Sequence, residues 1–202
     1  MTVVSQNADS HATRTSLLGR ARDRDPLAWS ELVDLYGPLI AHWCGRCGLD
    51  PHAAADCTQE VFAAVARSIG EFETKHPGGS FRGWLWTITS NKAKDRHRAD
   101  ARHVRADGGS TAFRTLSDIP DPIAIPDEEP TGDDQLDELL GRGLKQIRHE
   151  FADKTWRIFE RAVIDEIPSA TVAEEFGITP ATVRQTRSRI LRRLRQHLGD
   201  VS

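Results

Sequence analysis

The 202-residue sequence contains few cysteines, only three, and no long apolar run. An odd number of cysteines does not build a disulfide framework, which argues against a disulfide-rich secreted domain. No apolar stretch approaches the roughly 18 residues of a membrane span. Residues 1–16 have neither the basic flank nor the apolar segment of a secretory signal. We therefore expect a cytoplasmic protein with no membrane insertion.

The sequence also lacks the arrangements that carry most enzyme chemistry. It shows no nucleophile–base pattern and no glycine-rich phosphate loop, so we expect no catalytic residue, no enzyme activity and no cofactor. The stretch HWCGRCG places Cys44 and Cys47 at CxxC spacing beside His42, which leaves a zinc or thiol role open. No second ligand pair follows, although Cys57 could lie close in the fold. We expect no metal site and interpret these cysteines as small buried residues at a helix end.

Charge is unevenly distributed along the chain, although its net value is only −3. Residues 81–105 carry seven Lys or Arg against two Asp, and residues 181–197 carry six Arg and no acid. Between them, residues 106–140 are acidic and contain four prolines. Two basic segments joined by an acidic, proline-rich tether favour two contacts with a polyanion. A solvated helix face remains the ordinary alternative for either basic segment alone.

The first half of the chain has helical periodicity, and no alternating β pattern of useful length appears anywhere. We predict an all-α fold. A helix over residues 26–41 meets Gly37-Pro38, which predicts a kink or break there. Asp50 followed by Pro51 is typical of an N-cap and first helical residue, and predicts a helix over residues 51–72.

The helix predicted over residues 51–72 has two distinct faces. Its apolar residues are expected to be buried: Ala54, Cys57, Val61, Phe62, Val65 and Ile69. The opposite side carries a narrow polar stripe: Asp56, Gln59, Glu60 and Ala63. A loop over residues 73–80 follows, with Pro77 and a Gly-Gly pair as helix breakers.

The segment FRGWLWTITSNKAKDRHR, residues 81–98, combines aromatic residues with a basic end. Wound as a helix, it forms an apolar stripe that can face a core: Phe81, Trp84, Leu85 and Ile88. Trp86 is rotated about 100° per residue from Leu85, so we expect it to lie off this stripe and to be exposed. An exposed aromatic beside cations is typical of proteins that stack on nucleic-acid bases and hold the phosphates.

Residues 154–198 predict three helices with a short glycine turn before the last. The first ends before Pro168, and the second begins with Ser169 as its N-cap. Gly177 is expected to close the second helix in a left-handed conformation, and Thr179 with Pro180 to begin the third. A helix, a short turn and an arginine-rich helix form the helix-turn-helix pattern. Its inward residues are expected to be Val183, Ile190 and Leu194. An ordinary three-helix bundle with a solvated basic face is the alternative.

Three segments in this order resemble the bacterial ECF (extracytoplasmic-function) sigma factors of the sigma-70 superfamily: DPHAAADCTQEVF, FRGWLWTITSNKAKDRHR and the helix-turn-helix. The resemblance covers about residues 14–105 and 135–198. Its most specific part is the polar stripe with Phe62, followed at this distance by Phe81, Trp84, Leu85, Ile88 and Asn91. The resemblance implies two small helical domains, called σ2 and σ4, and a protein that binds core RNA polymerase and directs it to promoters.

This resemblance implies a division of the chain and its partners. We expect a disordered N-terminal tail over residues 1–13, a σ2-like domain over 14–105, an acidic flexible linker over 106–134 and a σ4-like domain over 135–198. The expected partners are promoter DNA and the β′ and β subunits of core RNA polymerase. An anti-sigma factor is a further partner that the resemblance allows.

The resemblance also assigns roles to individual residues. The polymerase-binding surface would comprise Asp56, Gln59, Glu60 and Ala63, docking on the coiled coil of β′. A solvated helix face is the ordinary alternative for this stripe, and only the resemblance favours docking. Reading and melting of the −10 element would fall to Phe72, Trp86, Asn91, Lys92, Lys94 and Arg98. The alternative for Trp86 is an aromatic ring tucked under the junction of the σ2-like domain and the linker. The −35 element would be read by Thr182, Arg184, Gln185, Ser188 and Arg189, because arginine can pair with guanine and glutamine with adenine.

A stand-alone helix-turn-helix regulator, acting without polymerase, is the alternative function. Such a protein would need a dimer interface and tight duplex binding of its own. The chain is net acidic, and its first half shows no ligand-pocket signature. These features favour the polymerase-dependent interpretation.

Overall fold

The computed structural model describes residues 16–72, 80–106, 125–126 and 128–199. Within these ranges every regular element is a helix, which confirms the all-α prediction. The tail predicted over residues 1–13, the loop over 73–79 and most of the linker predicted over 106–134 lie outside the described residues.

The chain divides into two compact units. The α4–α5 unit comprises residues 32–136, and the α8–α10 unit comprises residues 1–31 and 137–202. The second unit takes in the N-terminal residues as well as the helix-turn-helix. The domain boundaries drawn from the sequence at 14–105 and 135–198 stay a prediction.

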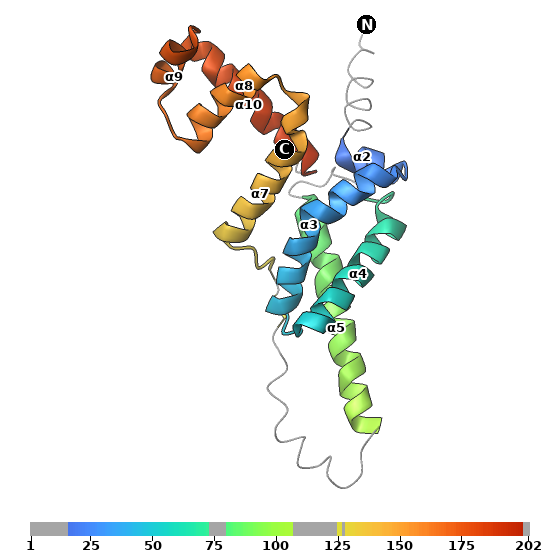
Figure 1. The fold of residues 1–202 in the computed structure, drawn as a ribbon. Helices are drawn as coiled ribbons and strands as arrows, with labels where there is room; N and C mark the ends of the chain where they lie inside the picture. Colours follow the sequence, from blue (N-terminus) through green and yellow to red (C-terminus); the bar gives the residue numbers. More distant parts are fainter. Residues whose placement is uncertain (1–15, 73–79, 107–124, 127, 200–202) are drawn as a thin grey trace, which may run out of the picture. The chain divides into compact units, whose positions relative to one another are not determined.

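The α4–α5 unit contains most of α3 (Pro26–Arg46), with α4 (Pro51–Ser68) and α5 (Phe81–Ala106) beside it (Figure 1). Of the kink or break expected at Gly37-Pro38, the break was wrong, because α3 runs on through Pro38 to Arg46. Proline inside a helix costs about 3 kcal/mol. The helix residues near Pro38 that are fully buried include Tyr36, Ile40 and Trp43. Each buried side chain stabilises the fold by about 2 kcal/mol, which together offsets the cost of the proline.

Local sequence signals set where α4 and α5 begin. Asp50 Oδ1 accepts hydrogen bonds from the backbone N–H groups of His52 and Ala53, at 2.9 and 3.1 Å, so the predicted cap is confirmed. Ser80 Oγ likewise accepts from Gly83 N at 3.0 Å at the start of α5. The apolar residues predicted to face inward from α4 are all buried: Ala54, Cys57, Val61, Phe62, Val65 and Ile69.

The α8–α10 unit contains α2 (Leu17–Arg22), most of α7 (Asp133–Ile147) and the 3₁₀ turn Arg148–Glu150. It continues with α8 (Asp153–Phe159), a π-helical turn (Glu160–Ile164), α9 (Ser169–Phe176) and α10 (Pro180–His197). Ile158, Val172, Ala173 and Val183 form one buried cluster that joins α8, α9 and α10. The predicted helix-turn-helix is therefore a packed unit.

The turn between α9 and α10 follows the sequence prediction closely. Gly177 has φ +64° and ψ +41°, the left-handed conformation that glycine adopts without a steric penalty. Thr179 Oγ1 accepts a hydrogen bond from Thr182 N at 3.2 Å and caps α10. The cap predicted at Ser169 was wrong by one position, since Ser169 is the first residue of α9 and Pro168 precedes it without a side-chain hydrogen bond.

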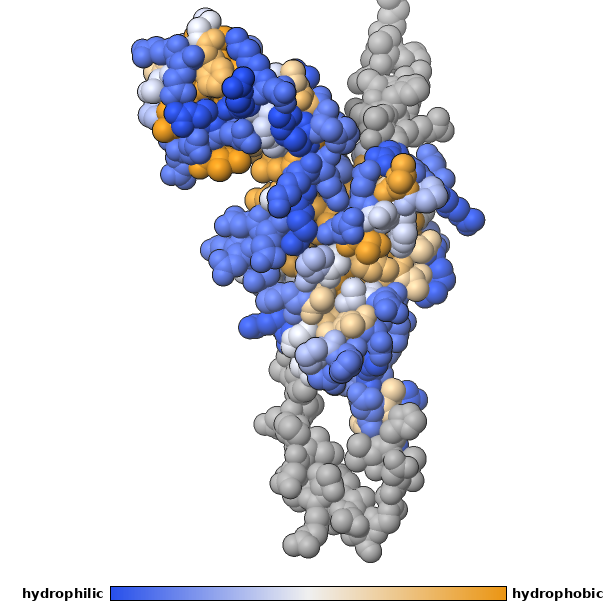
Figure 2. Space-filling model, viewed as in Figure 1, coloured by the Kyte–Doolittle hydropathy of each residue, from blue (hydrophilic) through white to orange (hydrophobic). Residues whose placement is uncertain are grey.

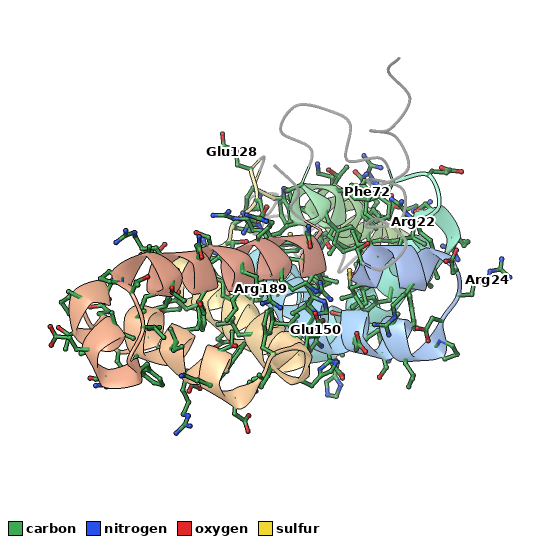
Figure 3. All side chains as sticks on the ribbon, turned by 90° about the horizontal axis from the view of Figure 1, so that it is seen from above. Arg22, Arg24, Phe72, Glu128, Glu150 and Arg189 are labelled. Carbon is green, nitrogen blue, oxygen red and sulfur yellow. The ribbon has the colours of Figure 1, made fainter. Side chains whose placement is uncertain are left out.

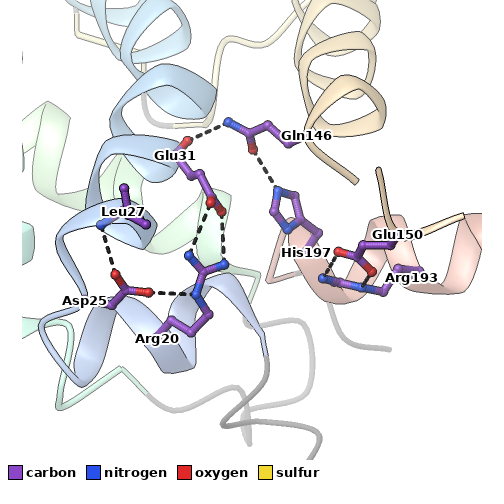
Figure 4. Close-up of polar contacts among 8 residues, drawn as sticks. All are labelled: Arg20, Asp25, Leu27, Glu31, Gln146, Glu150, Arg193 and His197. Carbon is purple, nitrogen blue, oxygen red and sulfur yellow. Dashed lines mark hydrogen bonds and ion pairs between the residues drawn. The ribbon is translucent and has the colours of Figure 1, made fainter. Parts of the chain in front are cut away.

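His197, at the end of α10, is buried and forms part of a polar network in the α8–α10 unit (Figure 4). Its Nε2 lies 2.7 Å from Gln146 Oε1. Because that amide oxygen can only accept, Nε2 carries the hydrogen and donates it. Gln146 Nε2 in turn donates to the Glu31 carbonyl oxygen at 2.9 Å, and Arg20 pairs with the Glu31 carboxylate at 3.2 Å.

Burial is the main reason that the imidazole of His197 is neutral. Desolvation, followed by the charge of Arg193, lowers the pKa of His197 from 6.5 to about 4. Glu31 and Glu150 oppose this shift, and Arg20 adds to it. His197 is thus neutral in the folded protein at pH values where it would gain a proton in the unfolded chain.

This histidine predicts a pH-dependent stability. The pKa of His197 is lower in the folded protein than in the unfolded chain, so its contribution to the free energy of unfolding is complete above pH 6.5. This contribution is lost as the pH falls from 6.5 towards 4, because the unfolded chain then binds a proton that the folded protein does not. We expect a loss of about 1 kcal/mol per pH unit in that window. Urea unfolding at pH 7.5 and pH 5 should show this slope in the wild type and a flatter one in His197→Gln. Equal slopes in both proteins would contradict the assignment.

Candidate functional site

The polar stripe predicted on α4 is exposed in the structure. Its members all lie at the surface, on the side of α4 opposite the buried Cys57, Val61 and Val65: Asp56, Gln59, Glu60 and Ala63. The sequence thus predicted their placement correctly. Their binding role stays a prediction.

The two carboxylates of this stripe pair with the basic end of α5. Arg96 Nη2 lies 2.9 Å from Asp56 Oδ2, and Arg96 Nη1 lies 3.6 Å from Glu60 Oε1. Lys92 Nζ lies 3.9 Å from Glu60 Oε2. The hydrogen bond to Asp56 raises the pKa of Arg96. The acidic face of α4 and the basic end of α5 are therefore one charged surface.

These ion pairs leave the carboxylates open to a second partner. The side chains of Asp56 and Glu60 remain 62% and 52% exposed. A carboxylate offers about four acceptor positions, and exposed ion pairs contribute only about 0–1 kcal/mol each. An arginine from another protein could therefore bind beside Arg96 or displace it. Sequence reasoning missed Arg96, because its partner is 40 residues away in the chain.

Beyond this surface, the basic end of α5 projects into solvent. Asn91, Lys94 and Arg98 are exposed, and Lys92 is half-buried. Arg98 Nη1 forms an ion pair with Asp95 at 3.6 Å, one turn earlier. An exposed amide followed by three cations is suited to a nucleic-acid strand, with the cations on phosphates.

Trp86 is not exposed as we expected. It is only 6% exposed, and its ring packs edge-on against Trp43 of α3, with centroids 5.7 Å apart and planes at 70°. α5 packs against α3 as well as α4, so its buried positions form a broader stripe than the periodicity suggested: Phe81, Leu85, Trp86, Thr89, Ser90 and Ala93. Trp84 and Ile88 of the predicted stripe are only half-buried.

Phe72, predicted to help hold a flipped base, is also buried, at 6% exposure. Its ring centroid lies 5.3 Å from that of Phe81 and 5.1 Å from that of Trp84. The Phe72 ring thus packs at Trp84, whereas Asn91, its expected partner in holding a base, lies seven residues further along α5. That separation is about 10 Å along the helix axis. The role of Phe72 stays a prediction, and its ring is part of an aromatic core cluster.

α10 presents a continuous polar face. The five residues predicted to read DNA are all exposed on it: Thr182, Arg184, Gln185, Ser188 and Arg189. The last four of these line one shallow groove together with Ala181 and Arg192. Arg189 extends from α10 (Figure 3). Its guanidinium lies over the Phe151 ring at 5.5 Å, which restrains its direction. The arginine and glutamine side chains on this face are of the kinds that can hydrogen-bond to base edges, and their reading of DNA stays a prediction.

The three cysteines are buried, and the hydrogen bond between Cys44 and Cys57 lowers the pKa of the Cys57 thiol. A hydrogen bond to Cys57, with burial, raises the pKa of the Cys44 thiol, and burial raises that of Cys47 to about 11. Cys57 does therefore lie beside Cys44, as the sequence allowed. Among the residues that the structure describes, no group of three or more His, Cys, Asp or Glu could hold a metal ion.

No described helix is long and apolar enough to cross a membrane. Figure 2 shows hydrophilic and apolar residues interspersed on the visible surface.

Comparison with known proteins gives consistent matches. Residues 32–103 match the family model described as Sigma-70 region 2. The chain is 26% identical over 193 residues to the ECF RNA polymerase sigma factor RpoE of Cereibacter sphaeroides, covering 91% of this chain and 94% of the relative. It is 26% identical over 180 residues to the ECF RNA polymerase sigma factor SigW of Bacillus subtilis, covering 88% and 92%.

Among solved structures, CnrH in complex with the cytosolic domain of CnrY is similar at 21% identity and a TM-score of 0.36. The match covers 95% of this chain and 99% of that chain.

The burial of Trp86 predicts a large effect on stability. Trp86→Ala removes a buried aromatic ring from its contact with Trp43, so we expect a loss of about 3 kcal/mol in the free energy of unfolding. Asn91→Ala, on the same helix but exposed, should change it by less than about 0.5 kcal/mol. Urea unfolding of both variants measures the difference. A Trp86→Ala protein as stable as Asn91→Ala would show that the ring is not packed.

Proposed function

The chain belongs to the ECF RNA polymerase sigma factors of the sigma-70 superfamily, and on this premise we propose how its surfaces divide the work of transcription initiation. α4 docks on core polymerase, the basic end of α5 engages the −10 element, and α10 reads the −35 element. The observation that carries this proposal is the exposed face of α4, whose acids stand beside the cations of α5 in one surface.

The α4 face has the chemistry of a docking surface for a basic partner. Asp56 and Glu60 can accept charge-assisted hydrogen bonds from arginines, and Gln59 between them offers a neutral amide. Ala63 keeps the surface low enough for another helix to approach. Complementary charge also speeds the encounter of two proteins. These features support a contact with the coiled coil of the β′ subunit.

The −10 element would be engaged by the second half of α5. Extruding a base from duplex DNA costs a few kcal/mol. Lys92, Lys94 and Arg98 would hold the backbone phosphates of the opened strand, while the exposed Asn91 amide would hydrogen-bond an extruded base. Trp86 would support the edge of the bubble only after its ring becomes accessible.

The −35 element would be read by α10 in the major groove. Arg184 and Arg189 can each pair bidentately with guanine, and Gln185 with adenine. Ser188 and Thr182 complete the face. A regulatory partner of the anti-sigma class stays a prediction of the sequence resemblance.

A helix-turn-helix regulator that acts alone is the second candidate. The α10 groove serves either function equally well, whereas the exposed acids of α4 serve only the polymerase-dependent one. A gel shift on promoter duplex separates the two. A sigma factor should require core polymerase for a stable complex, and a stand-alone regulator should not.

Reversing the charge of the docking acids should weaken core binding. We expect Asp56→Arg with Glu60→Arg to lower affinity for core polymerase by at least about tenfold. The introduced arginines would face cations on the partner, where the wild-type protein has acids. Helical content should be unchanged, since both side chains are exposed. Co-purification with core enzyme, followed by a titration, measures the affinity.

Two controls separate docking from the internal ion pairs. Arg96→Ala removes the partner of both acids without altering them, so it should bind core at least as well as the wild type. Asp95→Arg reverses an exposed acid outside the stripe and should also bind normally. Normal binding by the Asp56/Glu60 reversal would disprove the docking assignment.

Removing the α10 arginines should affect promoter recognition. Arg184→Ala or Arg189→Ala should each cost about 1–3 kcal/mol in promoter affinity if the side chain reads a base, with a change of preference at particular positions. Arg157→Ala, an exposed cation on α8, is the matched control and should have little effect. Holoenzyme binding to a panel of single-base promoter variants measures the preference. An equal loss on every sequence would instead indicate phosphate contacts, and no loss in the double variant would disprove the assignment.

A further inference from the structure

Two arginines on the exposed face of α10 differ in what lies beneath them. Arg184 and Arg189 both line the α10 groove and are both exposed. The central carbon of the Arg189 guanidinium lies over the Phe151 ring, 5.5 Å from its centroid. Among the residues that the structure describes, no ring lies under Arg184 in this way, and Arg189 has no carboxylate partner. The Arg189 N–H groups are thus free to donate, while the side chain itself is restrained.

The Phe151 ring is held in place by the residues around it. Phe151 follows the 3₁₀ turn Arg148–Glu150 and is 9% exposed, and its ring centroid lies 6.2 Å from that of Trp156 on α8. The Phe151 carbonyl oxygen accepts a hydrogen bond from Arg148 Nη1 at 3.2 Å. The Arg148 guanidinium also lies over the Trp156 ring, at 5.1 Å. Phe151 is therefore a fixed support for the cation above it.

A second contact joins the same turn to α10, one helical turn beyond Arg189. Glu150, next to Phe151 in the chain, accepts a hydrogen bond from Arg193 Nε at 2.6 Å (Figure 4). Arg193 Nη2 donates to the other carboxylate oxygen, so the pair is bidentate. Arg193 follows Arg189 by four residues and lies on the same side of the helix. The turn is thus fastened to α10 at two successive positions, which keeps the Phe151 ring beside Arg189.

Reading a base with arginine depends on how the guanidinium is oriented. Bidentate pairing with guanine uses two N–H groups of one planar fork. A free arginine side chain has several rotatable bonds, and fixing them upon binding costs conformational entropy. A ring face that attracts the cation limits its directions before DNA arrives, and such preorganisation strengthens binding. The Phe151 ring therefore acts on the property of Arg189 that base reading requires.

We propose that Phe151 is a positioning residue for promoter recognition, which orients the Arg189 guanidinium for bidentate pairing with guanine without itself touching the DNA. The proposal rests on the proposed function, because the orientation of Arg189 matters only if α10 reads the −35 element. It places a determinant of base preference outside the recognition helix, in the turn before α8.

The test measures base preference with the full chain assembled on core polymerase. The probe is a library of DNA duplexes with a randomised stretch, and sequencing of the bound fraction gives the preference at each position. Arg189→Ala identifies the position that Arg189 reads, where we expect guanine. Phe151→Leu keeps an apolar side chain but removes the ring. It should lower this guanine preference by about two- to fivefold, which corresponds to the loss of an exposed cation–π contact.

Base preference separates an effect on orientation from an effect on packing. A less stable protein binds every sequence less, which leaves the ratio between bases unchanged. Phe151→Leu should therefore spare the preference at the position that Arg184 reads. Phe151→Tyr keeps the ring and should keep the wild-type preference, whereas Phe151→Met, a second replacement without a ring, should lower it as Phe151→Leu does. Phe176→Leu, which alters an aromatic side chain of α9 packed against the buried cluster, is the matched control and should change no preference.

Three results would overturn the role of Phe151. These are an unchanged guanine preference in both ringless variants, an equal fall at the Arg184 position, and a fall in Phe151→Tyr as large as that in Phe151→Leu. In an Arg189→Ala background, Phe151→Leu should change no preference further, because the side chain that it orients is absent.

The failure of this proposal can be told from the failure of the proposed function. If Arg189→Ala leaves every preference unchanged, α10 does not read a base through Arg189, and the proposed function fails at that residue together with the role of Phe151. If Arg189→Ala removes the guanine preference and the ringless variants keep it, reading by α10 stands and only the role of Phe151 is overturned.

Discussion

The packing of α4 against α5 is the interaction on which the functional surfaces depend. α4 buries Cys57, Val61 and Val65, and larger side chains of this kind contribute about 2 kcal/mol each when fully buried. Because the buried side of α4 is fixed, Asp56 and Glu60 must face outward. The same packing brings them beside Lys92 and Arg96 of α5. One helix contact thus places the acids that we propose for polymerase docking next to the cations that we propose for DNA binding.

α5 illustrates how one helix can serve both core and surface. Its first half is held by aromatic contacts to α3, between Tyr36 and Phe81 and between Trp43 and Trp86. Its second half carries the cations. A polymerase arginine that binds Asp56 or Glu60 would compete with Arg96 for the same oxygens and would release a cation towards the DNA. Docking and DNA binding would then favour each other through shared charges.

Local patterns in the sequence predicted the parts of the fold that depend on neighbours along the chain. The caps at Asp50 and Thr179, the left-handed Gly177 and the buried face of α4 follow from residue type and helical spacing. The exposed faces of α4 and α10 followed from the same spacing. The errors came from tertiary packing: Pro38 stays within α3 because its neighbours are buried, and Trp86 is buried because α3 offers Trp43. The pairs Arg96–Asp56 and Arg82–Glu129 join distant parts of the chain, so no local pattern could reveal them.

The central claim is that this chain opens promoter DNA only together with core polymerase. Chromatin immunoprecipitation of the tagged chain would supply its promoters, and permanganate reactivity of the thymines in the −10 element reports strand opening on one of them. The account predicts reactive thymines when the chain and core polymerase are both present, and none with either alone. A chain that binds the duplex tightly without polymerase, and leaves those thymines unreactive when core enzyme is added, would contradict it.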